Sequence, residues 1–112
     1  MIIAIPMAGG EFCPHFGRCE RFALVEVDEA NRDLVGITEE IPPPHEPGVL
    51  PPWLRARRVD VVITGGMGPR AQQLFARDGI RVVVGATADT PENLAGAYLD
   101  GMLKPGENAC DH

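Results

Sequence analysis

The sequence contains no stretch that approaches the ~20 consecutive apolar residues of a membrane-spanning helix. Its first residues carry no basic segment, and the opening apolar run is broken by Pro6 after the length of a strand, which does not fit a signal peptide. We therefore expect a cytoplasmic protein without a membrane partner.

Positive charge is also scarce. Sixteen Asp and Glu residues outnumber ten Lys and Arg residues, which gives a formal net charge of -6. A surface of this sign repels a phosphate backbone. We therefore do not expect nucleic acid as a partner.

Cysteine is rare, with three residues in the chain. Three thiols cannot all pair, and in a reducing compartment thiols serve more often as metal ligands, reactive groups or packing than as a disulfide framework. The role of each cysteine has to be inferred from its local sequence.

The residues needed for hydrolysis do not gather. No Ser or Thr lies in a nucleophile elbow, and the acidic residues Glu11, Glu26, Asp28 and Asp60 fall at the ends of different predicted strands. A metal-dependent nuclease would need several carboxylates on adjoining strands. We therefore predict that the protein is not an enzyme.

What the sequence does contain is the pattern of one α/β domain spanning residues 1–112. Apolar runs predict strands at residues 1–5, 21–28, 34–41, 59–64 and 80–85. The second and third of these form a hairpin, and the fourth is apolar enough for a parallel sheet that is covered on both faces.

Three helices complete the pattern. They are predicted at residues 53–58, from Pro69 to a left-handed cap at Gly79, and from an N-cap at Thr90 to Gly101. A proline-rich irregular loop precedes the first helix, and residues 104–112 form a tail that could carry ligands. The order of elements predicts one mixed sheet, with a hairpin-built first half and a βαβ second half.

Two Cys-x-His pairs are candidate metal ligands, Cys13 with His15 and Cys110 with His112. An extended Cys-x-His segment directs both side chains to the same side, and Pro14 favours an extended Cys13. Together the pairs form a ligand set that suits zinc, copper or an iron-sulfur-type cluster. The alternatives are packed or solvent-facing side chains in the first pair and a frayed terminus in the second.

Cys19 and His45 are weaker candidates. Cys19 starts the second predicted strand, where a small buried thiol is the favoured interpretation. His45 lies in the proline-rich loop, which could fold over a ligand, although a solvated histidine is the simpler interpretation.

The segment Gly65, Gly66, Met67 and Gly68 precedes a predicted helix and offers backbone N–H groups to an anion. It matches neither a P-loop nor a complete G-x-G-x-x-G motif. The same groups could donate to the sulfides or oxo groups of a cluster, whose negative charge Arg18 and Arg70 would offset. The structural alternative is a tight turn that needs the freedom of glycine.

Four segments together resemble the dinitrogenase iron-molybdenum cofactor biosynthesis family. They are the Cys-Pro-His-Phe-Gly-Arg segment at residues 13–18, the Val-Val-Ile-Thr-Gly-Gly-Met-Gly segment at residues 61–68, the strand start at residues 79–82 and the terminal Asn-Ala-Cys-Asp-His segment at residues 108–112. The family includes the NifX and NafY cofactor carriers, the C-terminal part of NifB and small stand-alone proteins. The resemblance covers nearly the whole chain.

The resemblance implies a ribonuclease H-like fold with a five-stranded mixed sheet and a nitrogen-fixation-related role in binding or carrying a metal-sulfur cofactor. The orange protein of sulfate reducers, a related type, carries a molybdenum-copper sulfide cluster, so Fe-S, Fe-Mo and Mo-Cu clusters are all candidates. Relatives that end in Cys-x-His add weight to Cys110 and His112. Cys19 stands where the family is expected to have a small residue, often Ala, and is either an added ligand or a filler. The cofactor-binding residues that the resemblance implies are His15, Phe16, Gly17, Arg18, Gly65, Gly66 and Gly68.

Our leading hypothesis is a cofactor carrier that works as a monomer or weak homodimer and exchanges a metal cluster with a donor or acceptor protein. Two alternatives stay open. One is a structural zinc module in which the Cys/His pairs tether the tail, and the other is a phosphate- or nucleotide-binding regulator that uses residues 65–68.

Overall fold

The fold is built around the first strand. The computed structural model describes residues 1–44 and 48–103. β1 (Ile2–Ala8) lies inside a mixed sheet with the strand order β4-β3-β1-β5-β6, and the two-residue strand β2 (Glu11–Phe12) pairs with the end of β1. The other strands are β3 (Arg21–Asp28), β4 (Asp33–Glu40), β5 (Val59–Ile63) and β6 (Arg81–Val83).

The directions of the strands confirm the predicted mixed sheet. β1 runs antiparallel to β3, which forms an antiparallel hairpin with β4. On its other side β1 is parallel to β5, which is parallel to β6. The narrower label of a ribonuclease H-like fold stays a prediction.

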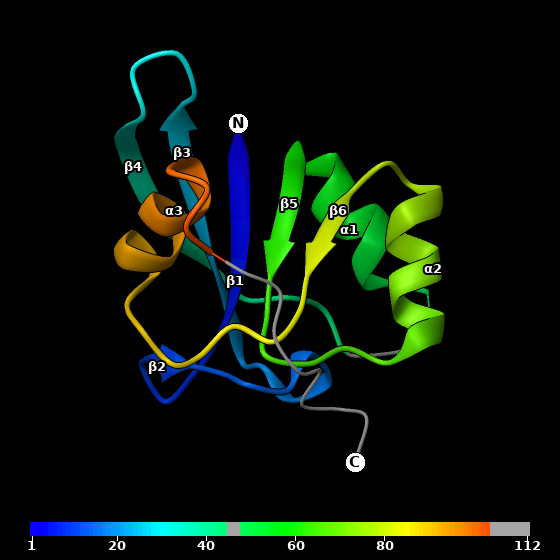
Figure 1. Ribbon diagram of the computed structural model, residues 1–112. Helices are drawn as coiled ribbons and strands as arrows, with labels where there is room; N and C mark the ends of the chain where they lie inside the picture. Colours follow the sequence, from blue (N-terminus) through cyan, green and yellow to red (C-terminus); the bar gives the residue numbers. More distant parts are fainter. Residues whose placement is uncertain (45–47, 104–112) are drawn as a thin grey trace.

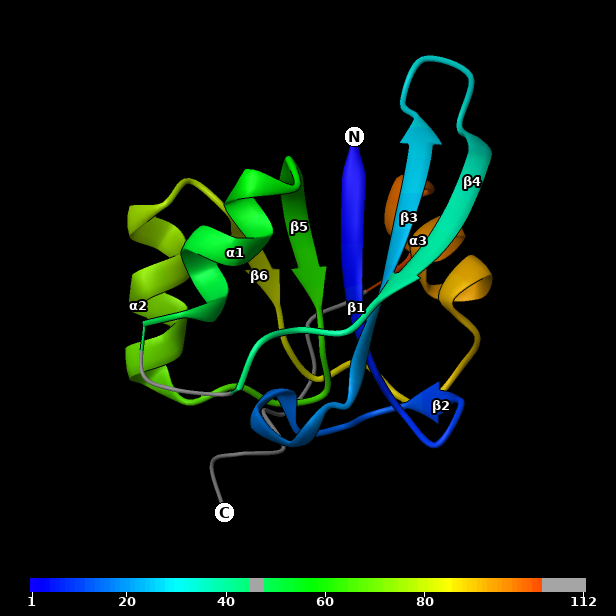
Figure 2. The ribbon, with the colours of Figure 1, turned by 180° about the vertical axis from the view of Figure 1, so that it is seen from behind.

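Helices cover both faces of the sheet, so the molecule has three layers (Figure 1). α1 (Leu50–Ala56) and α2 (Pro69–Arg77) lie on one face, and α3 (Pro91–Leu99) lies on the other. The view from behind shows the same division, with α1 and α2 in front of the sheet and α3 beyond it (Figure 2). None of the helices in the described parts of the chain has the length and apolarity needed to cross a bilayer.

The strands supply both cores because successive side chains point to opposite faces. In β3, Ala23, Val25 and Val27 pack in the cluster beneath α3, whereas Phe22 and Leu24 pack in the cluster beneath α1 and α2. Both faces of β3 are therefore buried.

Several bounds differ from the prediction. The first strand was predicted to end at residue 5, whereas β1 continues through Pro6 to Ala8. β2 was not predicted, because two residues carry no periodicity. α1 begins at Leu50 instead of residue 53, since prolines at its first positions lose only N–H groups that a first turn leaves unpaired. β6 ends at Val83 because Gly85, at φ 82°, turns the chain toward the end of β5.

The predicted cap of α3 is confirmed and gives a first test. The Thr90 hydroxyl accepts a hydrogen bond of 3.2 Å from the backbone N–H of Asn93. We expect Thr90→Ala to lower the free energy of unfolding by about 1 kcal/mol, because the N–H loses its acceptor. Thr90→Ser, which keeps the hydroxyl, should cost less than half of that in urea unfolding. Equal losses in the two variants would show that the hydroxyl does not stabilise α3.

Candidate functional site

The candidate site lies at the edge of the sheet where three parallel strands end. β1, β5 and β6 all finish at the lower edge in Figure 1, and the chain segments that follow them gather there. Two of these segments carry the predicted residues. We call residues 13–19 the first loop and residues 64–68 the glycine turn.

The two segments are in direct backbone contact. The backbone N–H of Phe16 donates to the Gly66 carbonyl at 3.0 Å, and His15 and Gly66 form an isolated parallel bridge. A Cβ atom on Gly65 would lie 2.7 Å from the Pro14 carbonyl oxygen and 3.0 Å from the Pro14 Cα. Gly65 is therefore required for this contact to form.

Hydrogen bonds on the other side fix the glycine turn to the chain after β6. The Thr64 N–H donates to the Val83 carbonyl, the Gly85 N–H donates to the Gly65 carbonyl, and both distances are 2.9 Å. The fully buried Thr64 hydroxyl donates to the Gly66 carbonyl at 3.3 Å. Thr64 was not predicted as a site residue, although a hydroxyl at the end of an apolar strand was visible in the sequence.

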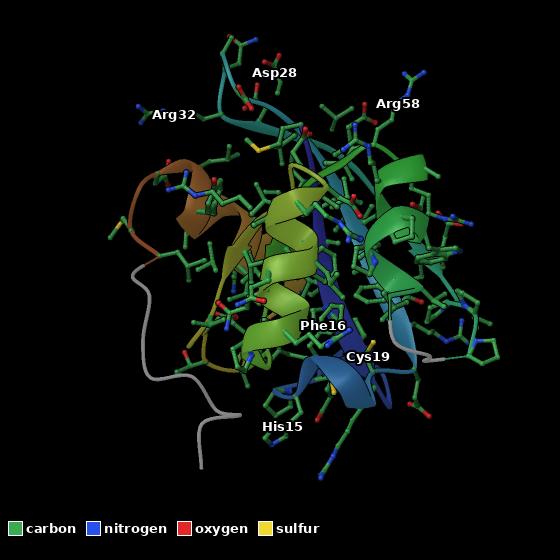
Figure 3. All side chains as sticks on the ribbon, turned by 90° about the vertical axis from the view of Figure 1, so that its right-hand side faces the viewer. His15, Phe16, Cys19, Asp28, Arg32 and Arg58 are labelled. Carbon is green, nitrogen blue, oxygen red and sulfur yellow. The ribbon has the colours of Figure 1, made fainter. Side chains whose placement is uncertain are left out.

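Phe16 anchors the first loop in the core. It begins the short 3-10 helix η1 (Phe16–Arg18), and its ring lies 5.3 Å from that of Phe75 and 5.6 Å from that of Phe22. Figure 3 shows the ring directed from η1 into the molecule. The Phe16 side chain thus holds the loop in place, and its role toward a cofactor stays a prediction.

Cys13 and His15 occupy different environments. Cys13 is buried, and its thiol donates to the His15 carbonyl at 3.2 Å. His15 is half-buried and lies on the outer side of η1 in Figure 3. The joint binding of one ion by these residues stays a prediction, and Cys13 would have to give up its hydrogen bond to take part.

Cys19 has the environment of the small buried thiol that the sequence favours. Its side chain packs in the cluster beneath α1 and α2. Burial, and secondarily the nearby Cys13 thiol, raises the pKa of Cys19 to about 12. The Cys19 thiol is therefore protonated at neutral pH, which makes it a poor nucleophile and a poor metal ligand in this state.

The remaining candidates are exposed or lie elsewhere. Arg18 and Arg70 are exposed, and Arg70 lies in the first turn of α2, whose N-cap is Gly68. Cys110, His112 and His45 lie outside the described residues. Within residues 1–44 and 48–103, no group of three or more His, Cys, Asp or Glu residues could hold a metal ion.

Two cavities open at this edge, of about 370 and about 410 Å³. Both include Gly10, in the turn between β1 and β2, and neither of the two includes a residue of the first loop or the glycine turn. These cavities lie beside the contact between the two segments. They are therefore not evidence for a cofactor site at residues 13–19 and 64–68.

The dinitrogenase iron-molybdenum cofactor family matches residues 1–101 of the chain. The chain belongs to this family. Both segments of the candidate site fall inside the matched region. The resemblance that the sequence motifs indicate is thereby confirmed, and a cofactor-related role follows from membership of the family.

Relatives of the same length support the assignment. MJ0580, an uncharacterized protein of Methanocaldococcus jannaschii, is 32% identical over 111 residues, which cover 96% of this chain and 92% of MJ0580. The crystal structure of PH0822 has a TM-score of 0.83 at 29% identity and covers 99% of this chain and 96% of its own. The apo orange protein of Desulfovibrio gigas has a TM-score of 0.75 at 25% identity and covers 96% of this chain and 93% of its own.

The contact between Gly65 and Pro14 leads to a prediction about this family member. We expect Gly65→Ala to lower the free energy of unfolding by about 1–3 kcal/mol, because the methyl group displaces the first loop. Gly68→Ala is the matched control in the same turn. A Cβ on Gly68 meets nothing within 4 Å and its φ is -63°, so we expect only the cost of a poorer N-cap of α2, about 0.5 kcal/mol. Equal effects in urea unfolding would contradict the close approach.

The raised pKa of Cys19 predicts a loss of stability at alkaline pH. Protonation of the folded thiol contributes stability that is complete below the unfolded pKa of about 8.5 and is lost as the pH rises toward the folded value. Cys19→Ala lacks this titration. Under reducing conditions, we expect the stability difference between the parent protein and the variant to shrink between about pH 7.5 and about pH 10.5. A difference that stays constant would mean that the thiol is not shielded.

Proposed function

We propose that this protein is a non-enzymatic carrier that binds a metal-sulfur cofactor or its precursor at the edge formed by the first loop and the glycine turn. The observation that carries the proposal is the direct contact between these two segments, His15 with Gly66, in a member of the family. The similarity to the apo orange protein over 96% of this chain adds support.

The donor set at this edge fits an anionic cluster better than a single chelated ion. A half-buried imidazole and two exposed guanidinium groups lie at His15, Arg18 and Arg70. Guanidinium groups donate charge-assisted hydrogen bonds to anionic acceptors, and the start of α2 adds a partial positive charge. The described residues contain no complete group of metal-ligating side chains. We therefore propose binding through charge and hydrogen bonds, with His15 as a direct ligand.

The bound cluster would be cargo, and the described residues do no chemistry on it. The glycine turn would place its backbone N–H groups near the sulfides, and the buried Phe16 would keep the first loop rigid around them. Cys110 and His112, outside the described residues, are proposed as further ligands, and Cys13 as one that must break its hydrogen bond to His15. A donor or acceptor protein is the proposed partner.

Retention of metal tests the proposal. Protein produced and purified without oxygen is expected to hold iron or molybdenum together with acid-labile sulfide, and to absorb visible light. Metal and sulfide analysis with a visible spectrum measures this. Protein that retains neither metal nor sulfide after reconstitution would contradict the proposal, and stoichiometric colourless zinc would favour a structural site.

Two variants and one matched control test the binding residues. We expect His15→Ala and Arg70→Gln to lower the bound metal about tenfold at limiting cluster, because each removes a ligand or a charge-assisted hydrogen bond. Arg77→Gln, at the opposite end of α2 and also exposed, is the matched control and should bind as the parent does. Equal binding by Arg70→Gln and Arg77→Gln would exclude α2 from the site.

A further inference from the structure

A cavity on the opposite edge of the sheet carries two arginines. Its volume is about 570 Å³, and it lies where β6 begins, near the tip of the β3–β4 hairpin and the end of α3. In Figure 1 this region is at the top of the molecule, and the first loop and the glycine turn are at the bottom. The residues of the candidate cofactor site do not line it.

The polar lining is cationic although the protein is acidic. Arg32 and Arg81 contribute two guanidinium groups and Glu29 one carboxylate, so the lining is positive in a chain whose net charge is -6. Arg81 donates to the Tyr98 hydroxyl, a neutral partner, at 3.4 Å. Across the described residues, neither arginine forms an ion pair. An anion in the cavity would therefore meet two guanidinium groups that form no ion pair, with Glu29 as the one carboxylate in the lining.

The hairpin turn holds Arg32 over the cavity. Asp28 accepts hydrogen bonds from the Asn31 side chain at 2.9 Å and from the Ala30 N–H at 3.0 Å, and these bonds, the first above all, lower the pKa of its carboxyl group. Arg32 follows in the left-handed region, at φ 57°, which an arginine rarely adopts. Figure 3 shows Arg32 at the hairpin tip on the side of α3. The turn thus sets the backbone at Arg32, from which the exposed side chain reaches the lining of the cavity.

The rest of the lining is apolar. Val83, Leu99 and Leu103 contribute to it, and the Tyr98 ring adds an aromatic surface. Pockets for small molecules are mostly apolar, with a few charged groups that orient the ligand, and have volumes of about 300–1,000 Å³. Guanidinium forks match the geometry of a carboxylate. The ligand should therefore combine a carboxylate with an apolar body.

We propose that this cavity is a second binding site, which takes a small organic carboxylate with an apolar body. Arg32 and Arg81 bind the carboxylate, Tyr98 positions Arg81, and the apolar lining covers the body of the ligand. The site is independent of the cofactor edge.

Phenylacetate is a suitable probe, and amide chemical shifts in NMR titrations report where it binds. We expect saturable binding in the millimolar range, with shifts at the start of β6, the end of α3 and the hairpin tip. Phenylacetamide, which lacks the charge, and inorganic phosphate, which lacks the apolar body, should each bind at least about fivefold more weakly. Equal binding of either compound would overturn the proposed ligand class.

Matched variants separate the two arginines from general surface charge. Arg32→Asn should weaken phenylacetate binding about tenfold, because it removes a charge-assisted contact. Asn adopts the left-handed region more readily than Arg, so the turn should be kept. Arg58→Asn is the control, since Arg58 also has a positive φ, 62°, and lies on the opposite side of the molecule in Figure 3.

Tyr98→Phe tests the contribution of Arg81 to phenylacetate binding. It removes only the hydroxyl that holds Arg81, and we expect a loss of about threefold with an unchanged melting temperature. Unchanged binding in both Arg32→Asn and Tyr98→Phe, or an equal loss in Arg58→Asn, would overturn the proposal. The absence of any localised shift with phenylacetate would overturn it as well.

Discussion

The close approach of two backbone segments, at Pro14 and Gly65, is the constraint on which the candidate site depends. β1 and β5 pair in parallel through Ile2 to Ala4, and the chains after them separate and meet again where Phe16 donates to Gly66. A side chain at residue 65 would overlap the Pro14 carbonyl, so the contact exists only because that residue is glycine. This contact sets how closely the first loop approaches the glycine turn.

The aromatic side chains explain why the first loop keeps that position. Phe75 on α2 and Phe22 on β3 both contact the Phe16 ring, and Phe22 is 5.9 Å from Trp53 on α1. Arg57 stacks 3.8 Å above the Trp53 ring and pairs with Glu40 at 2.9 Å. Each ring buries a large apolar area. The loop is therefore fixed to both helices on its face of the sheet, and its backbone is organised before a ligand arrives.

The sequence predicts the frame of this fold well because its signals are local. The apolar run of β5, the Thr90 cap and the left-handed Gly79 are each determined by neighbouring residues, and they are confirmed. The environment of Cys13 could not be predicted from neighbouring residues. β2 continues into a bond from the Cys13 N–H to the Pro6 carbonyl, at 2.9 Å, and this pairing places the thiol among residues that are distant in sequence. A two-residue strand is too short for its periodicity to predict this pairing. The spacing of Cys13 and His15, in contrast, is visible in the sequence. The motif therefore points to the loop as a candidate site but leaves open which of its side chains faces a ligand.

The arginines show how one side chain serves different purposes in a small acidic protein. Arg57 is neutralised by Glu40 and covers Trp53, and Arg55 donates to the carbonyl of Asp78 beyond the end of α2, so both stabilise the packing of α1. Arg32 and Arg81 have no carboxylate partner in the described parts of the chain and share one cavity. An unpaired surface arginine has no significance alone, because exposed ion pairs contribute little to stability. Two that are held over the same apolar lining, one by a hairpin turn and one by Tyr98, create a local positive potential that folding does not require. The strands between this cavity and the cofactor edge are hydrogen-bonded on both sides and close-packed between helices, so the two proposed sites lie at opposite edges of one sheet.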